Sequence, residues 1–245
     1  MRISIGFQVG TMILALMGSS MLLTAGLNKT GNSVIPLPPP QKKGDLSVEA
    51  ALQNRRSERQ YKKTPFSKEI LGQILWAAQG ITERSDNPPS FWGDRPWAGG
   101  FRTAPSAGAL YPMDVYVVVG DVEDITPGVY RYFPGRHALE HTKDGDHRQD
   151  LSRAALGQSC VHNGAVVLIL SGVYARCAAK YGERAQRYTH IETGCIGQNI
   201  YLQAESLGLG TVMVGAFDDE RVQSVLGLSQ DEMPLAIMPV GHKNP

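Results

Sequence analysis

A cluster of basic side chains is the first feature of this sequence that could do chemistry. The run Arg55-Arg56-Ser57-Glu58-Arg59 places three guanidinium groups and a hydroxyl within five residues. Such groups bind a phosphate through bidentate, charge-assisted hydrogen bonds. The alternative is a solvated helix end, where basic side chains interact favourably with the helix dipole.

The overall charge limits what kind of ligand this cluster can serve. The 245-residue chain has 24 Lys+Arg and 23 Asp+Glu, which gives a formal net charge of +1. A protein without a general basic field does not gather nucleic acid or a polyanionic surface, so any anion must be held locally. We therefore expect no nucleic-acid partner.

Two segments rich in small residues could accept a flat ligand. Ala104–Pro112 precedes a predicted strand, and Gly208–Phe217 has glycines at both ends of another. Small residues allow close approach to the backbone and leave N–H groups free to bind. For the first segment an ordinary tight loop is the alternative. The second has no GxGxxG motif before a helix and no acidic partner after it, so a Rossmann dinucleotide site is not supported.

The usual nucleophile and metal motifs are absent from the sequence. There is no GxSxG, and Cys160 with His162 lacks an obvious third partner, so we expect a buried cysteine beside a capping histidine. His190 and Glu192 lie two positions apart on a predicted helix and face different sides, so we predict no metal site. The three cysteines are too few and too dispersed for a disulfide scaffold. Three further histidines are expected at the surface: His137, His141 and His147.

Hydrophobic periodicity predicts an α+β domain whose mixed or antiparallel sheet is flanked by helices, one of them long and buried. In the long helix, Ile191, Cys195, Asn199 and Leu202 recur at helical spacing. The expected helices span 47–56, 67–80, 188–207 and 218–226, and the expected strands span 115–119, 129–133, 137–141, 166–170, 211–214 and 235–240.

The N-terminal part is predicted to lie outside this domain. Between Arg2 and Lys29 the sequence is uncharged and longer than the roughly 20 apolar residues that cross a bilayer. We predict a signal peptide or membrane anchor over residues 1–28, with membrane contact only through residues 3–28. The domain is then exported or anchored; the side of the membrane stays open, although lysines after the segment favour the cytoplasm.

Two other segments lack a regular pattern. The proline-containing residues 29–45 are predicted to form an extended linker, which leaves residues 46–245 as one domain. Residues 82–103, which include Trp92 and Trp97, are predicted to form a long irregular excursion, interpreted as a lid.

Four motifs together resemble the nitroreductase family of flavoproteins. They are RRSER, PSAGALYP before a strand, THIETGCIGQNIYLQAESLGLGTVMVGAF, and PLAIMPVGHK. The resemblance covers Leu46–Lys243 and is closer to the branch of SagB-type dehydrogenases of thiazole/oxazole peptide biosynthesis. It implies an intertwined homodimer with an α+β fold that binds FMN at the dimer interface. Hydride would pass between a small-molecule or peptide substrate and the flavin N5, with NAD(P)H as a candidate reductant.

The resemblance also implies roles for the basic cluster. Arg55, Arg56 and Ser57 would hold the FMN phosphate and ribityl chain, and Arg59 would face the pyrimidine edge of the flavin. A positive group there stabilises the anionic reduced flavin and raises its potential. This agrees with the anion site that the residue types alone suggest.

The other motifs would complete the flavin site. One segment is expected to reach the flavin from the other subunit, and a strand end to place a backbone N–H near N5. The first comprises Pro105, Ser106, Ala107 and Gly108, and the second Val214 and Gly215. Gln198 and Asn199 lie in the long-helix motif, where packing is the expected role.

Two features depart from the family pattern. Many relatives continue into an extension whose basic residue touches the phosphate, and here Lys243, or His242, is the candidate. The lysine and tyrosine that azoline oxidation is thought to use are not placed, because Tyr111 lies near the flavin segment but no lysine accompanies it. Azoline oxidation is therefore weakly supported.

The leading hypothesis is an FMN-dependent oxidoreductase with no assigned catalytic side chain. The alternatives are a flavin-binding module without redox turnover and a membrane-tethered interaction protein. The sequence names neither the substrate nor the choice between NADH and NADPH, because loop sequence does not encode ligand shape legibly.

Overall fold

A single antiparallel sheet organises the chain. The computed structural model describes residues 26–27, 33–84 and 100–244. Within these residues nine strands pair in the order β1-β2-β8-β7-β6-β9-β11-β10, with β3 on β11. The strands are β1 (Gly26–Leu27), β2 (Ser33–Pro36), β3 (Tyr61–Lys62), β6 (Met113–Val119), β7 (Gly128–Phe133), β8 (Ala138–Asp144), β9 (Val166–Gly172), β10 (Leu209–Thr211) and β11 (Met233–Lys243). The predicted α+β class is confirmed.

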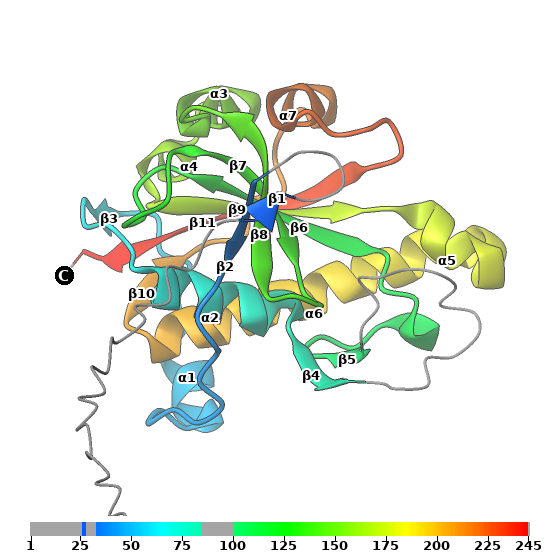
Figure 1. Cartoon of the computed structure of the whole chain (residues 1–245), viewed down its shortest axis with the longest axis horizontal. Helices are drawn as coiled ribbons and strands as arrows, with labels where there is room; N and C mark the ends of the chain where they lie inside the picture. Colours follow the sequence, from blue (N-terminus) through cyan, green and yellow to red (C-terminus); the bar gives the residue numbers. More distant parts are fainter. Residues whose placement is uncertain (1–25, 28–32, 85–99, 245) are drawn as a thin grey trace, which may run out of the picture.

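Helices cover both faces of this sheet (Figure 1). One layer holds α1 (Val48–Asn54), α2 (Lys68–Gln79) and α6 (Ala185–Ser206). The other holds α3 (Arg148–Ala154), α4 (Ser159–Asn163) and α7 (Asp219–Leu226), while α5 (Tyr174–Tyr181) lies near the start of α6. Because both faces are covered, the central strands β6 and β9 are apolar on both sides, as their continuous apolar sequences predict.

The local signals for α2 and α7 are confirmed. The Ser67 hydroxyl accepts a hydrogen bond from the Ile70 N–H at 3.4 Å and caps α2. The predicted apolar side of α2 is buried, although Ile70 is only partly so. Asp218 caps α7 by accepting from the Arg221 N–H at 3.0 Å. Cys160, in α4, is buried as expected.

The buried face of α6 differs from the predicted one. Ile191, expected on that face, is 58% exposed. The buried side is built mainly from small and polar residues, together with two isoleucines: Thr189, Glu192, Thr193, Ile196, Gly197, Ile200 and Ala204. Their polarity hides the face from a hydrophobicity pattern, since Thr189 and Thr193 satisfy their hydroxyls on carbonyls one turn back, each at 2.9 Å.

Residues 33–37, expected in a linker, instead join the sheet. β2 pairs with β8, Leu37 is buried, and the Leu37 N–H donates to the His137 carbonyl at 3.0 Å. His137 is not a simple surface residue: its ring contacts the Tyr132 hydroxyl at 2.8 Å and the Pro38 carbonyl at 2.9 Å. Burial lowers the pKa of His137 and so favours the neutral ring, while the hydrogen bond to the Pro38 carbonyl acts in the opposite direction.

The predicted strand over 211–214 is shorter than expected. β10 ends at Thr211, and Val214 joins Ile237 as an isolated bridge. β11, in contrast, extends well beyond the predicted 235–240 at both ends.

The ends of the predicted excursion pair with each other. β4 (Ile81–Arg84) and β5 (Gly100–Arg102) form a separate antiparallel ladder. Trp92, Trp97 and nearly all of residues 1–28 lie outside the described residues. In the part of the chain that is described, no helix has the length and apolarity needed to span a bilayer.

Candidate functional site

The basic cluster lies in a segment, residues 55–62, that follows α1 and ends with β3; we call this segment the strap. The helix ends at Asn54, and Arg55 is its C-cap residue, with φ −51° and ψ 126°, so the chain leaves the helix at the first residue of the cluster. The strap runs along the edge of the sheet because the Glu58 N–H donates to the Thr211 carbonyl at 2.9 Å, and β3 then pairs with the end of β11. Arg55 and Arg56 thus stand at the end of α1, where Arg56 donates to the Gln53 carbonyl, so the helix-end alternative applies to these two arginines. Residues 57–59 continue along the sheet edge.

Two glycines allow the strap to lie close to the sheet. A Cβ added at Gly210, in β10, would be 2.8 Å from the Glu58 Cβ, and one at Gly241, in β11, would be 2.6 Å from the Tyr61 Cβ. The Tyr61 hydroxyl donates to the Glu58 carbonyl at 2.7 Å and closes the strap on itself. Any side chain at these glycines would displace the basic cluster.

Tyr201, on α6, joins the strap to the segment after β10. Its hydroxyl accepts from the Met213 N–H at 2.8 Å and lies 3.1 Å from the Ser57 Oγ. The Arg55 guanidinium carbon lies 5.0 Å from the centre of the Tyr201 ring, within cation–π range. The sequence analysis missed this residue, although it lies within the long-helix motif, one turn after Gln198.

The arginines of the strap remain available to an anion. Arg56 donates to the carbonyls of Gln53 and Arg55, each at 2.9 Å, and Arg59 donates to the Ser57 carbonyl at 3.3 Å. Among the described residues, no carboxylate lies within ion-pair distance of these guanidinium groups. Ser57, Arg56 and Arg59 are exposed, and Arg55 is half-buried.

Further predicted site residues lie at the same end of α6. Val214 is buried by its bridge to Ile237, whereas Gly215 is exposed, with open space where a side chain would stand. Lys243, at the end of β11, lies beside the strap because it pairs with Tyr61 of β3. Its ammonium group is bound to the Glu205 carboxylate of α6 at 2.7 Å. Lys243 would therefore have to leave Glu205, or share its charge, to contact a phosphate.

The two residues of the long-helix motif behave differently from each other. The Asn199 amide donates to the Thr103 carbonyl at 3.2 Å, so it has the packing role expected, while Gln198 is exposed. Beside Asn199 a groove of about 620 Å³ separates residues 41–48 from α2 and α6.

The small-residue loop lies at the opposite end of α6 (Figure 1). Pro105 is exposed, the Ser106 Oγ accepts from the Tyr111 N–H at 2.9 Å, and a 3-10 turn covers Ala107–Ala109. Gly108 has φ +62°, and a Cβ there would lie 2.7 Å from the Tyr181 hydroxyl and 3.1 Å from the Lys180 Nζ. One chain therefore divides the predicted site residues into two groups, the strap group and the loop group.

Lys180 and Tyr181, like Tyr201, are site residues that the sequence motifs did not indicate. They end α5 directly against Gly108, with the Lys180 Nζ 5.4 Å from the centre of the Tyr181 ring. The Tyr181 ring packs edge-on against Tyr188 at 4.9 Å. Here a lysine and a tyrosine lie together beside the loop, whereas the sequence analysis searched only around Tyr111. The adjacent Lys-Tyr just before the long-helix motif was the available signal.

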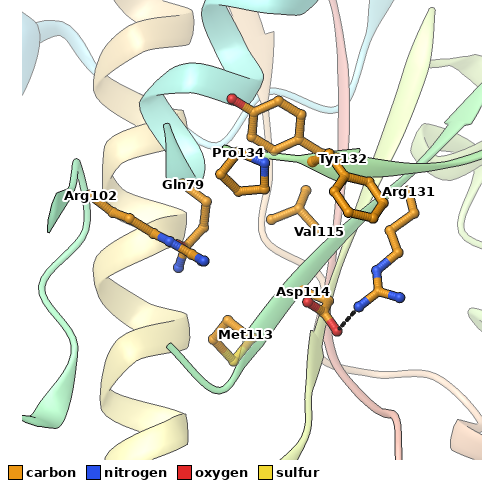
Figure 2. A pocket seen from close by; sticks show the side chains of 9 residues that line it. Gln79, Arg102, Met113, Asp114, Val115, Arg131, Tyr132 and Pro134 are labelled. Atoms are coloured by element: carbon orange, nitrogen blue, oxygen red, sulfur yellow. Dashed lines mark hydrogen bonds and ion pairs between the residues drawn. The ribbon is translucent and has the colours of Figure 1, made fainter. Parts of the chain in front are cut away.

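A network of buried polar side chains lies beneath the loop. Arg102 donates to the Gln79 Oε1 at 2.7 Å, and Gln79 donates to the Glu192 Oε1 at 3.2 Å. Figure 2 shows the Arg102 side chain running toward Gln79, with Asp114 bonded to Arg131 nearby. Burial raises the pKa of Glu192 to about 7 and lowers that of Arg102 to about 10. The small cavity there, about 10 Å³, has room for about one water.

Comparisons with known proteins identify the family. A family model described as the nitroreductase family matches residues 52–242. A Methanocaldococcus jannaschii protein named as a nitroreductase is 41% identical over 81% of this chain and 92% of its own length. The microcin B17-processing protein McbC of Escherichia coli is 30% identical over 58% of this chain and 55% of its own. The NADPH-flavin oxidoreductase of Vibrio harveyi is 30% identical over 43% of this chain and 47% of its own.

A solved structure agrees with this result. A crystal structure from Ralstonia eutropha, titled as a nitroreductase, has a TM-score of 0.68 at 26% identity and covers 90% of this chain and 94% of that one. The helix-flanked antiparallel sheet is thus a nitroreductase-like fold. The chain belongs to the nitroreductase family and is related to an NADPH-flavin oxidoreductase.

The close contact between strap and sheet gives a testable prediction. Gly241→Ala should lower the free energy of unfolding by about 1–3 kcal/mol, because the new methyl overlaps the Tyr61 side chain. Gly194→Ala is the matched control: Gly194 is exposed on α6 with open space around it, so alanine should leave stability equal or raise it by up to about 1 kcal/mol. Urea unfolding curves measure both, and an unchanged midpoint for Gly241→Ala would contradict the packing described.

Proposed function

We propose that this protein is an FMN-dependent oxidoreductase that passes hydride between a substrate, or NAD(P)H, and the flavin N5. The observation that carries the proposal is the strap, where three arginines and Ser57 lie together at the sheet edge without a carboxylate partner among the described residues. Family membership and the relationship to an NADPH-flavin oxidoreductase support it.

The residues present fit the phosphate and ring of FMN. Arg55, Arg56 and Ser57 supply the donors that a phosphate needs, and the Tyr201 hydroxyl keeps Ser57 in place. Open space above Gly215 lets a flat ring approach the backbone there. Lys243 would contact the phosphate only by leaving or sharing its ion pair with Glu205.

The protein's own part in the reaction is mainly electrostatic. FMN, when bound, supplies a ring that accepts or releases a hydride. Arg59 would place its positive charge at the pyrimidine edge, where negative charge develops on reduction, and so favour the reduced form. The exposed Gly215 backbone would leave the reacting face open to a substrate.

The division of the site between two ends of α6 supports a homodimer. Glu192, beneath the loop, and Tyr201, at the strap, are nine residues apart, which is roughly 13 Å along a helix. In an intertwined dimer, Pro105–Gly108 of one copy would approach the strap of the other. Each site would then use the strap of one chain and the loop of its partner.

We further propose that the substrate belongs to the class taken by SagB-type dehydrogenases, an azoline ring in a peptide. The likeness to McbC, a microcin B17-processing protein, supports this, as does the Lys180–Tyr181 pair beside Gly108. Oxidation of an azoline to an azole removes two hydrogens, one as hydride to the flavin and one as a proton to a base. Lys180 and Tyr181 would accept and hold that proton.

The N-terminal segment bears on where this reaction takes place. We propose that residues 1–28 export the domain or anchor it to a membrane. Fractionation of cells producing the full chain and a chain that begins at Ser33 tests this: the full chain should be found with the membrane or outside the cytoplasm, and only the shorter chain in the cytoplasmic fraction. Equal distribution of the two would refute the proposal.

The phosphate-binding role predicts a large effect of two substitutions. Arg55→Ala combined with Arg56→Ala should weaken FMN binding at least about 100-fold, because each lost charge-assisted hydrogen bond contributes about 1.5–3 kcal/mol. Isothermal titration calorimetry with FMN measures this. The control is Arg153→Ala with Arg221→Ala, which removes the same charge from two exposed ion pairs and should leave binding unchanged. Equal affinities for the two double variants would exclude the strap as the phosphate site.

The proton-accepting role makes a separate prediction. Lys180→Met and Tyr181→Phe should each lower the rate of oxidation of a synthetic thiazoline peptide by about 100-fold or more while FMN stays bound. Mass spectrometry of the peptide follows the loss of two hydrogens, and Lys63→Met, at an exposed lysine, is the control. If the wild type reduces a quinone with NADPH but never oxidises the peptide, the azoline proposal fails and the oxidoreductase proposal stands.

A further inference from the structure

The loop that carries Ser106 and Gly108 has an unfavourable backbone. Gly108, Ala109 and Tyr111 have φ values of +62°, +53° and +47°. Glycine adopts the left-handed region freely, whereas alanine and tyrosine do so at an energetic cost. Such residues stay in that region only where the surrounding structure holds them. The contacts of Tyr111 therefore decide whether the loop keeps its shape.

Three polar side chains hold Tyr111. Its N–H donates to the Ser106 Oγ at 2.9 Å, and its carbonyl accepts from the Arg176 Nη1 at 3.5 Å. The Arg102 guanidinium carbon lies 4.2 Å from the centre of its ring. Arg102 ends β5 and is only 8% exposed, so its own position depends on buried partners.

Those buried partners lead to Glu192. Arg102 is held by Gln79 of α2, and Gln79 is held in turn by the Glu192 Oε1. Glu192 is 2% exposed, and its other oxygen, Oε2, is buried with no hydrogen-bond partner among the described residues. A buried ionised oxygen without a partner is costly. Protonation of Oε2 removes that charge and leaves a neutral O–H, while Oε1 continues to accept the hydrogen bond from Gln79.

The groups that face Glu192 determine its protonation. Burial raises the pKa of Glu192 to about 7, against the opposing effects of the nearby Ser106 hydroxyl, the Gln79 hydrogen bond and the Arg102 and Arg176 charges. Few glutamates change charge this close to neutrality.

The other titratable groups of the network keep their charge near neutral pH. Burial lowers the pKa of Arg102 only to about 10 and raises that of Tyr111. Burial favours protonation of Asp114 on β6, but hydrogen bonds and charge from Arg176 and Arg131 hold its pKa below the ordinary value. Glu192 is then the member of this network that titrates near neutral pH.

We propose that Glu192 is a positioning residue: with a proton it completes the network that holds the loop 105–111, and without one it favours a loosened loop in which water reaches the carboxylate. The direction follows from linkage. A carboxyl that binds its proton more tightly in the closed loop than in water stabilises the closed loop at low pH. This stabilisation is lost as the pH rises through the pKa that the carboxyl has in the closed loop. The role in catalysis rests on the proposed function, because this loop is the part expected to reach the partner's flavin.

Amide hydrogen exchange of the full chain tests the proposal without any flavin. The measured quantity is the equilibrium constant for opening of the loop 105–111, corrected for the intrinsic pH dependence of exchange. It should increase about tenfold between pH 6 and pH 8 and level off above, if the carboxyl in the opened loop has its ordinary affinity for protons. Glu192→Gln keeps the Oε1 acceptor but cannot ionise, so its loop should stay protected across this range. Glu220→Gln, on the exposed start of α7, should follow the wild type.

The outcomes separate this inference from the proposed function. A flat wild-type profile overturns the inference, as does an equal rise in Glu192→Gln. If that variant does not fold, the wild type alone decides. The pH midpoint of its increase in loop opening is compared with the pH midpoint of the Glu192 titration measured by carboxyl 13C NMR. Midpoints that lie far apart overturn the inference. A pH-dependent loop in a chain that binds no FMN leaves the inference standing and removes the proposed function. If loop opening does not change with pH in a chain that binds and reduces FMN, the inference fails and the proposed function stands.

Discussion

The long helix α6 is the constraint on which both halves of the candidate site depend. Its 22 residues span roughly 33 Å, and its buried face of small and polar side chains lies against the sheet. Near one end Glu192 supports the loop, and toward the other Tyr201 bonds the strap and the Met213 backbone together. Neither half of the site can move along the sheet without disturbing the packing of this helix.

That arrangement explains why the candidate site needs few side chains that act as nucleophiles, acids or bases. The strap contributes charge, and two glycines allow it to lie against the sheet edge. The loop contributes backbone conformation, which a buried network maintains. An oxidoreductase that relies on a bound flavin needs its protein mainly to bind, orient and tune that group. The donors and open backbone found here suit such a task better than they suit acid–base chemistry by many side chains.

Sequence reasoning could predict what depends on local pattern. The two-sided burial of β6 and β9 and the cap at Ser67 both follow from neighbouring residues. Sequence reasoning could not predict the buried face of α6, because threonine, glycine and glutamate on that face do not produce a periodic pattern of apolar residues. It also missed the pairing of β2 with β8 and the contact of Lys180 with Gly108, since these join segments distant in the chain. Prolines near residue 36 suggested a linker, although an edge strand tolerates proline as well.

The central claim is that the strap and its surroundings form a flavin site in a redox enzyme. The most direct measurement is an absorbance spectrum of the full chain, purified with added FMN and freed of unbound flavin, before and after anaerobic NADPH or a thiazoline peptide. We expect a yellow protein with close to one FMN per chain that bleaches with at least one of these reductants. A colourless protein, or bound flavin that neither reductant bleaches, would contradict it.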